Sequence, residues 1–325
     1  MNSPIILTLE ILHKLYQKTL GNQLPDLQRE TNPNKISEMI CNLLSSNEPC
    51  MIARFGANEL NAVINYLGVN SRHSIWKFIK GEHPAWWWNR NIMYNMQNNA
   101  GFFPITKDNM QRFGEMMLRD TQEVDILGSW LKEEIFLDNY LKKALKIQLM
   151  YLDPFWSQKP WSSSLEGKKI LIVHPFVETI LSQYPKREFL FSDKKILPTF
   201  KSIQTIKAVQ SLGGKSNDFK DWFEALTFMK NEISKSDFDI CLIGCGAYGF
   251  PLAAHVKRIG KKAIHMGGSL QLLFGIMGNR WDHDKPHYEN GTFIYYAGLE
   301  NKYWVRPSLS ERPTNHNSIE NSCYW

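Results

Sequence analysis

The stretch from residue 238 to residue 260 constrains the fold of this chain more than any other part of the sequence. A β-rich apolar run, Phe238 to Ile243, leads into a glycine-rich turn, and a helical pattern follows from Pro251 to Ile259. Small residues let a phosphate approach the backbone, and the start of a helix offers N–H groups that have no intrahelical partner. The pattern predicts a phosphorylated ligand on this turn, held by Gly244, Gly246, Tyr248 and Gly249. The alternative is that these glycines only allow a tight turn and close packing of helix on strand.

The second half of the chain alternates strand and helix patterns. The run Lys168 to His174, with two basic residues before its apolar part, is typical of a buried parallel strand, and further strands are expected at Glu188 to Phe191 and Lys262 to Met266. Helices are expected over 203–211 and 220–233. Such alternation predicts an α/β fold, Rossmann-like, with a mostly parallel sheet.

The first half carries fewer strand signals. Helical spacing occurs near residues 5–20 and 36–45, and the run Cys50 to Phe55 predicts a short strand that is followed by a helix over 58–66. Residues 76–160 are rich in tryptophan, with helical spacing at 110–118 and 131–152, and they predict a helical cap. We therefore expect N-terminal helices over 1–48, one α/β domain over 49–310 with this helical insert, and a tail over 311–325.

Composition narrows the class of protein. The net charge of +6 comes from basic residues scattered along 325 residues, so no concentrated patch favours nucleic acid as a partner. The five cysteines form no CxxC pair, and the N-terminus lacks the pattern of a signal peptide. The expectation is a cytoplasmic protein with at most peripheral membrane association. Most of the tryptophans are expected in the core, but of Trp86, Trp87 and Trp88 at least one is expected near the surface, at an acceptor groove or a membrane interface.

A second candidate site lies where the strand before Gly56 turns into a helix. Arg54 and Glu59 flank this turn, and a strand-to-helix turn aims both side chains at the carboxyl edge of the sheet, where open α/β sheets bind ligands. The alternative is that Glu59 complements the helix dipole and Arg54 is its ion-pair partner. Further candidates for the same edge are Asn58, His174, Glu178, Gly267, Gly268 and Arg280.

The strand that ends at Met266 argues against two common cofactors. A dinucleotide site, like a methyltransferase site, places an acidic residue at the end of the strand after the glycine turn. Here the strand end reads Ile264 to Gly268 and contains no carboxylate. The Asp- and His-rich run over 279–284 matches no metal-ligand spacing, and we expect it to be a solvated loop.

The segment Arg54-Phe55-Gly56-Ala57-Asn58-Glu59 and the later strand, glycine turn and helix together resemble the bacterial GT-D-type glycosyltransferases. The segment in that family reads Arg-aromatic-Gly-Asp-x-Glu, so Ala57 stands where the family has Asp. From about residue 50 onward the chain also resembles poorly characterised proteins of bacterial capsule and lipopolysaccharide clusters. That likeness is carried by the stretch Asn98 to Pro104, the Gly244 to Gly268 unit and the ending Cys323-Tyr324-Trp325.

The resemblance implies transfer of a sugar from a nucleotide-diphosphate donor to a saccharide or lipid-linked acceptor at the inner face of the membrane. Glu59, His174 and Glu178 are the ordered candidates for the base, and Arg54, Arg280 and the turn amides are candidates for the diphosphate. The family pair is associated with Mg²⁺ or Mn²⁺, which would involve Glu59, but the missing oxygen ligand at Ala57 argues against a tightly held ion unless Asp125, Glu178 or Asp282 replaces it. Two alternatives stay open. The chain could be another enzyme with a phosphate-bearing ligand on the same fold, or a non-catalytic binding subunit of a polysaccharide assembly complex.

Overall fold

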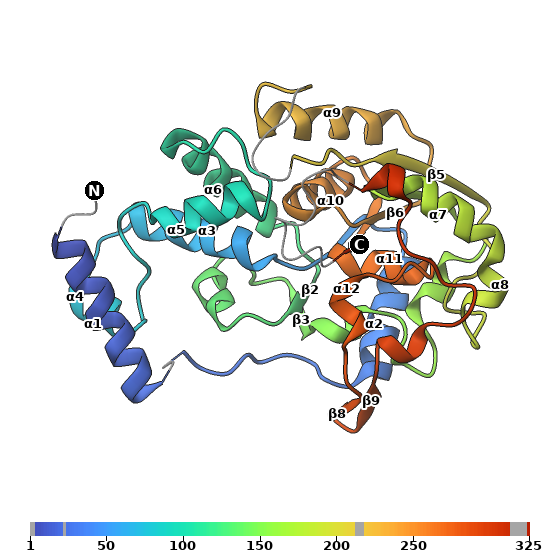
Figure 1. Ribbon diagram of the computed structural model, residues 1–325, viewed down its shortest axis with the longest axis horizontal. Helices are drawn as coiled ribbons and strands as arrows, with labels where there is room; N and C mark the ends of the chain where they lie inside the picture. The colour runs from blue at the N-terminus through green and yellow to red at the C-terminus, as the bar shows by residue number, and fades with distance from the viewer. Residues whose placement is uncertain (1–3, 22–23, 212–217, 313–323) are drawn as a thin grey trace.

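A seven-stranded sheet forms the centre of the protein (Figure 1). The computed structural model describes residues 4–21, 24–211, 218–312 and 324–325. The strand order is β3-β2-β1-β7-β6-β4-β5, and every neighbouring pair is parallel. The predicted Rossmann-like α/β fold with a mostly parallel sheet is therefore confirmed. The strands are β1 (Cys50–Ala53), β2 (Ile126–Ser129), β3 (Leu145–Gln148), β4 (Lys169–His174), β5 (Ser202–Lys207), β6 (Ile240–Ile243) and β7 (Lys262–His265).

Helices cover both faces of the sheet, which explains why the central strands read as continuous apolar runs. All four residues of β1, β2 and β6 are buried. The first face packs against α3 (Ala57–Val69), α6 (Lys107–Thr121), α9 (Trp222–Lys235) and α10 (Gly249–Arg258). The second face packs against α2 (Pro33–Ser45), α7 (Val177–Gln183), α8 (Arg187–Leu190) and α11 (Leu270–Leu273).

Neighbouring strands send the chain to opposite faces. After β1 and β6 the chain enters α3 and α10 on the first face, whereas after β7 and β4 it enters α11 and α7 on the second. Where adjacent connections diverge in this way, a crevice opens at the carboxyl edge of the sheet. The fold therefore places the ends of β1, β7, β6 and β4 around one crevice.

Three predicted elements are wrong. Residues 203–211 were expected to be helical but begin with the edge strand β5, in which the β-branched residues Ile203, Thr205 and Ile206 pair with β4. The strand expected over 188–191 is instead the short helix α8. The helix expected over 131–152 is a 3₁₀ segment, Lys132–Leu137, followed by β3, and β2 also lies in the region expected to be a helical cap. Apolar runs this short do not distinguish helix from strand by spacing.

Residues 76–125 contain three helices, as expected of a helical region, with turns and loops over 80–89 and 99–106, and further small elements complete the chain. They are α4 (Ile75–Ile79), α5 (Arg90–Asn98), α12 (Asn279–Asp282) and the hairpin β8 (His287–Glu289) with β9 (Thr292–Ile294). Trp161 is fully buried, while Trp86, Trp87 and Trp88 are partly exposed and Trp76 is exposed. The proposed division into 1–48, 49–310 and 311–325 stays a prediction, and most of the tail, with Cys323, lies outside the described residues.

The N-terminal helix α1 (Pro4–Leu20) lies at one end of the molecule beside α4 (Figure 1). His13 contacts the carbonyl of Phe78 through Nδ1 at 2.8 Å, and the Gln17 side chain donates to the carbonyl of Lys80 at 3.0 Å. Within the described residues, no helix combines the length and apolar character needed to cross a membrane.

Candidate functional site

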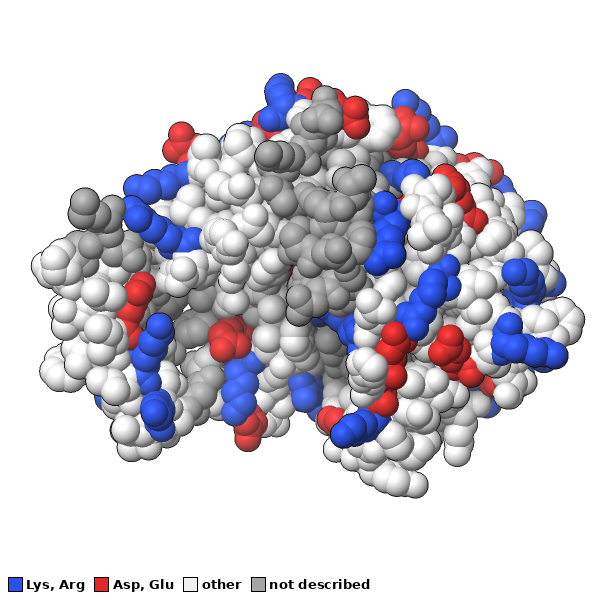
Figure 2. Space-filling view, in the orientation of Figure 1, with Lys and Arg blue, Asp and Glu red and all other residues white. Residues whose placement is uncertain are grey.

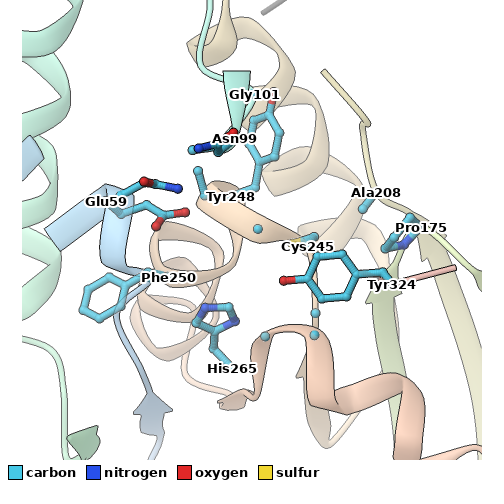
Figure 3. Close-up of a pocket in the computed structure, with 18 of the residues that line it drawn as sticks. Glu59, Asn99, Gly101, Pro175, Ala208, Cys245, Tyr248, Phe250, His265 and Tyr324 are labelled. Carbon is cyan, nitrogen blue, oxygen red and sulfur yellow. The ribbon is translucent and has the colours of Figure 1, made fainter. Parts of the chain in front are cut away.

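A cavity of about 220 Å³ opens at the crevice formed by β1, β7, β6 and β4 (Figure 3). Glu59, His265 and Tyr324 approach it from three sides. Most of the residues that the sequence singles out line it: Arg54, Gly56, Asn58, Glu59, His174, Gly244, Gly246, Tyr248, Gly267, Gly268 and Arg280. Gly249 and Glu178 are not among the lining residues.

The turn after β1 brings a cation and a carboxylate together. Gly56 is the N-cap of α3 and provides no side-chain cap. A Cβ atom at Gly56 would lie 1.9 Å from Glu59 Oε2, so the absent side chain is what admits the carboxylate over the start of the helix. Burial lowers the pKa of Arg54 from its ordinary 12.5, and the nearby negative charge of Glu59 partly restores it. Arg54 therefore stays protonated, and Glu59, only 9% exposed, supplies the opposite charge beside it.

In the glycine turn after β6, two glycines allow close packing, and a third lies beside open space. A Cβ atom at Gly244 would lie 2.6 Å from the carbonyl oxygen of Gly267, and one at Gly249 would lie 2.1 Å from Cε1 of His265. Gly246 differs, because its φ of +54° requires glycine while the space around it is open. Close packing thus explains why Gly244 and Gly249 are glycines. The interpretation that the turn binds a ligand now depends on Gly246 and the backbone amides that follow it.

Two buried histidines at the ends of β4 and β7 carry opposite hydrogen-bond roles. The backbone N–H of Phe176 donates to His174 Nδ1 at 3.0 Å, which assigns the ring proton of His174 to Nε2. His265 Nδ1 lies 3.3 Å from the carbonyl of Ile243, which can only accept, so its Nε2 keeps a lone pair. Burial lowers the pKa of both rings to about 3, and both are neutral. His174 therefore presents a donor and His265 an acceptor.

Sequence reasoning did not select His265, although the rule that selected His174 applies to it equally. Both residues end a buried strand, and a turn follows each of them. At the end of β7 only a carboxylate that could bind a ribose was considered, and not the histidine at that position.

The aromatic residues Tyr324 and Trp325 form one wall of the cavity. The Arg280 guanidinium lies over the Tyr324 ring at 4.7 Å, and Gln271 Nε2 donates to the carbonyl of Tyr324 at 3.3 Å. Trp325 packs against Phe176, with ring centroids 6.0 Å apart. The sequence offered these positions only through a family resemblance.

The opposite wall is built around Tyr248. Its hydroxyl lies 2.8 Å from Ser211 Oγ, which donates to the carbonyl of Gly101 at 2.6 Å, and its ring stacks on Trp222 at 4.8 Å. Tyr248 lines the cavity as expected, but its hydroxyl already has a protein partner. The stretch from Asn99 to Gly101 completes this wall.

None of the three carboxylates considered as replacements at Ala57 reaches the cavity. Asp125 precedes β2 at the amino edge of the sheet, where it pairs with Lys257 at 2.8 Å. Glu178, in the first turn of α7, faces Lys207 at 3.6 Å on the surface, and Asp282 pairs with Arg306. The run over 279–284 is also not simply a loop, since it begins as α12 and buries Trp281.

The donor set of the cavity is poor in metal ligands. Glu59 is the one carboxylate among the described residues that line it, and the described part of the chain contains no group of three or more His, Cys, Asp or Glu side chains arranged for a metal ion. A single carboxylate beside Arg54 and Arg280 does not offer the oxygen ligands that Mg²⁺ or Mn²⁺ prefers. The arrangement instead suits an anionic ligand.

One further carboxylate, Asp153, lies behind Arg54. Its oxygens accept from Ser269 Oγ at 2.6 Å and from the Tyr296 hydroxyl at 2.7 Å. Burial raises its pKa to about 6, against these two hydrogen bonds and the charge of Arg54. Asp153 therefore shares the electrostatic field of the site without lining the cavity.

Comparison with known proteins gives one finding. No family model matches the chain, and no curated protein matches it. A solved structure described as the selenomethionine-substituted form of domain of unknown function 1792 aligns with 80% of this chain and 81% of that chain, at 12% identity and a TM-score of 0.36. A TM-score of this size adds nothing to the geometry described above.

Proposed function

We propose that this chain is a glycosyltransferase that moves a sugar from a nucleotide-diphosphate donor to a hydroxyl of a saccharide or lipid-linked acceptor. One observation carries the proposal: one cavity at the carboxyl edge of the sheet combines Arg54 and Arg280 with the carboxylate of Glu59. Glycosyl transfer from such a donor needs both a group that stabilises a leaving diphosphate and a group that accepts a proton.

The cations and the helix starts suit the diphosphate. Arg54 and Arg280 provide guanidinium groups that match phosphate oxygens, and N–H groups at the starts of α3 and of the segment after Gly246 face the same crevice. His174 adds a neutral Nε2–H donor. Tyr324 and Trp325 offer flat rings on which a base or a sugar can stack.

Glu59 suits the proton transfer. The acceptor oxygen forms its bond to the anomeric carbon while the bond from that carbon to the diphosphate oxygen breaks. In an inverting reaction the hydroxyl proton passes to Glu59, and the nucleoside diphosphate leaves with its charge held by the arginines. His265 Nε2 is a neutral acceptor that can take a hydrogen bond from the acceptor hydroxyl.

Because the cavity offers few metal ligands, we propose that the guanidinium groups of Arg54 and Arg280 stabilise the diphosphate charge, as a divalent ion does in related reactions. With Glu59 as the one carboxylate among the described lining residues, we expect donor binding to persist in a chelator. A place at the inner face of the membrane, in the synthesis of cell-surface polysaccharide, is part of the proposal and rests on the motif resemblance.

Donor binding tests the first half of the proposal. Purified protein is screened by thermal shift against UDP-, GDP-, CMP- and dTDP-sugars, with NAD and S-adenosylmethionine as comparison ligands, each with Mn²⁺ and with chelator. A ligand at about 100 times its Kd stabilises the folded chain by about 2.7 kcal/mol. A shift with one class of nucleotide sugar supports the proposal, and a shift with NAD or S-adenosylmethionine alone overturns it.

Two variants test the assignment of roles. Glu59→Gln is expected to lower kcat about 100-fold or more while the donor Kd stays unchanged. Arg54→Gln is expected to weaken donor binding about tenfold or more, because it removes a charged hydrogen-bond donor. Arg187→Gln and Glu188→Gln, a surface pair 3.8 Å apart on the far side of the sheet, are the matched controls. Full activity in both site variants would disprove the assignment, and donor binding without product across an acceptor panel would instead favour a non-catalytic binding subunit.

A further inference from the structure

The solvent-facing side of α1 is apolar. Leu7, Ile11 and Leu15 recur at every fourth residue and therefore form one stripe, with Leu12 beside it. All four side chains are exposed, by 54%, 49%, 54% and 42% respectively. The opposite side, with Leu9, packs on the protein and includes the polar residues His13 and Gln17. The side that faces the protein also includes Ile6 and Tyr16, so the side that faces water is about as apolar as the side that faces the protein, and α1 lacks the usual polar outer face.

The neighbouring helix α4 adds to this surface. Ile75 is 50% exposed and Trp76 is 73% exposed, whereas Phe78 and Ile79 of the same helix are buried. Across the described residues, eight of the eighteen large apolar side chains that are exposed belong to α1 and α4. These eight are Ile5, Leu7, Ile11, Leu12, Leu15, Leu20, Ile75 and Trp76. The apolar surface of the protein is therefore concentrated at this end of the molecule.

Basic side chains surround the apolar stripe. Lys14 lies at the edge of the α1 stripe, and Lys18 continues the line of the stripe one turn after Leu15. Three more exposed cations lie within or next to α4, against two acidic residues, Glu10 and Glu82, over residues 4–20 and 72–82. The three cations near α4 are Arg72, Lys77 and Lys80. In Figure 2 this end shows broad uncharged surface with only a few charged side chains.

We propose that α1 and α4 form a docking surface for an anionic lipid membrane, with α1 lying in the plane of the interface. A helix with an apolar stripe bordered by lysines inserts the stripe between lipid headgroups, while the lysine ammonium groups reach the phosphates. An exposed tryptophan beside it suits the same layer of the membrane. The charge complementarity selects a membrane over a second copy of the chain, since lysine is depleted at the cores of protein interfaces.

This inference is independent of the proposed reaction. It rests on residues remote from the cavity, and its test uses neither donor nor acceptor. Membrane binding without transferase activity, or activity without membrane binding, would therefore show which of the two ideas had failed.

The test measures co-sedimentation of the full chain with vesicles of phosphatidylcholine, with or without phosphatidylglycerol. The wild-type protein is expected to bind the vesicles that contain phosphatidylglycerol and to bind them less at high salt. The paired substitution Leu7→Ser and Leu15→Ser is expected to lower the partition coefficient about tenfold or more, because two apolar side chains no longer enter the interface. Lys14→Gln with Lys18→Gln is expected to lower binding to anionic vesicles about 25-fold, at roughly fivefold per lysine.

The matched control is Leu181→Ser with Leu309→Ser, two leucines exposed by 43% and 82% away from α1 and α4. This control is expected to bind vesicles like the wild-type protein, and circular dichroism with thermal melting checks that every variant is folded. Absence of wild-type binding to anionic vesicles would overturn the proposal, as would an equal loss in the control. Light scattering addresses the competing occupant: a dimer that the Leu7/Leu15 substitutions dissociate, with no vesicle binding, would also overturn it.

Discussion

Substitution of Gly249 by alanine tests whether the glycine turn is there for packing. Gly249 has φ −62° and ψ −46°, which alanine adopts without strain, so any cost must come from the added methyl group. That carbon would lie 2.1 Å from Cε1 and 2.4 Å from Nδ1 of His265, where ordinary contacts are 3.4–4 Å. The ring is 3% exposed and lies near the carbonyl of Ile243, so it has little room to move.

The expected loss of stability follows from these contacts. Overpacking of a buried site costs about 1–3 kcal/mol, and a weakened ring hydrogen bond adds about 1 kcal/mol. The higher helix propensity of alanine returns up to about 1 kcal/mol. We therefore expect Gly249→Ala to lower the free energy of unfolding by about 1–3 kcal/mol.

Urea unfolding of four proteins measures this effect: the wild type, Gly249→Ala, His265→Ala and the double variant. In the His265→Ala protein the methyl group added at position 249 enters the space that the imidazole ring has left. The loss of unfolding free energy in the double variant should therefore be smaller than the sum of the two single losses by about 1 kcal/mol or more. A Gly249→Ala protein as stable as the wild type would refute the reasoning. Two losses that simply add would refute it as well.

Three other expectations follow from the site and its surroundings. Gly56→Ala should change the free energy of unfolding by only about 1 kcal/mol, because the atoms that the new methyl group meets are the far end of the flexible Glu59 side chain, but it should lower kcat about as far as Glu59→Gln does. Unchanged turnover would count against the base assignment. Because burial raises the pKa of Asp153 to about 6, the folded chain holds a proton between about pH 4 and pH 6 that the unfolded chain has released, so this group makes the protein less stable as the pH rises. Asp153→Asn should remove that slope, worth at most roughly 3 kcal/mol, and urea titrations of both proteins at the two ends of this window would show equal slopes if the idea is wrong. Burial raises the pKa of the Cys245 thiol far above its usual range while Cys41 is only half-buried, so peptide mapping after alkylation of the native protein should find Cys41 modified first among the four described cysteines, and early modification of Cys245 would contradict the closed packing of the turn.

The sheet could be predicted best where strands are buried on both faces. β4 and β6 contain continuous apolar runs, and β7 follows a clear helix end at Gly260 and precedes a glycine turn; the expected strands overlap all three observed ones closely. β5 and β3 are the edge strands of the sheet, and beyond β2 the strand β3 has only a single bridge, from Ile147 to Glu30. The mixed sequences of both strands give no such signal. Their identity as strands depends on the neighbour that they pair with, which local spacing does not reveal.

The site could be predicted in part for a related reason. Parallel strands bring their carboxyl ends to one edge, so Arg54, His174 and the glycine turn were expected to meet, and the structure places them around one cavity. The role of Asp153 could not be expected, because its pKa is raised by burial and its hydrogen-bond partners stand more than 100 residues away in the sequence. Asp125 was considered for the carboxyl edge of the sheet, but it precedes β2 and therefore lies at the amino edge.

The pairing of β1 with β7 has a consequence for how the chain is made. Cys50 is in register with Lys262, so 211 residues must be synthesised between the two partners, which takes about 10–40 s at 5–20 residues per second. During that time β1 can pair with β2, but the side of β1 that later pairs with β7 has no strand beside it. All four residues of β1 are buried in the finished protein. An open apolar edge is a template for pairing with other chains. The nascent protein is therefore expected to depend on chaperones until β7 has left the ribosome, and a synonymous change that slows translation between these strands should lower the soluble yield without changing the folded product.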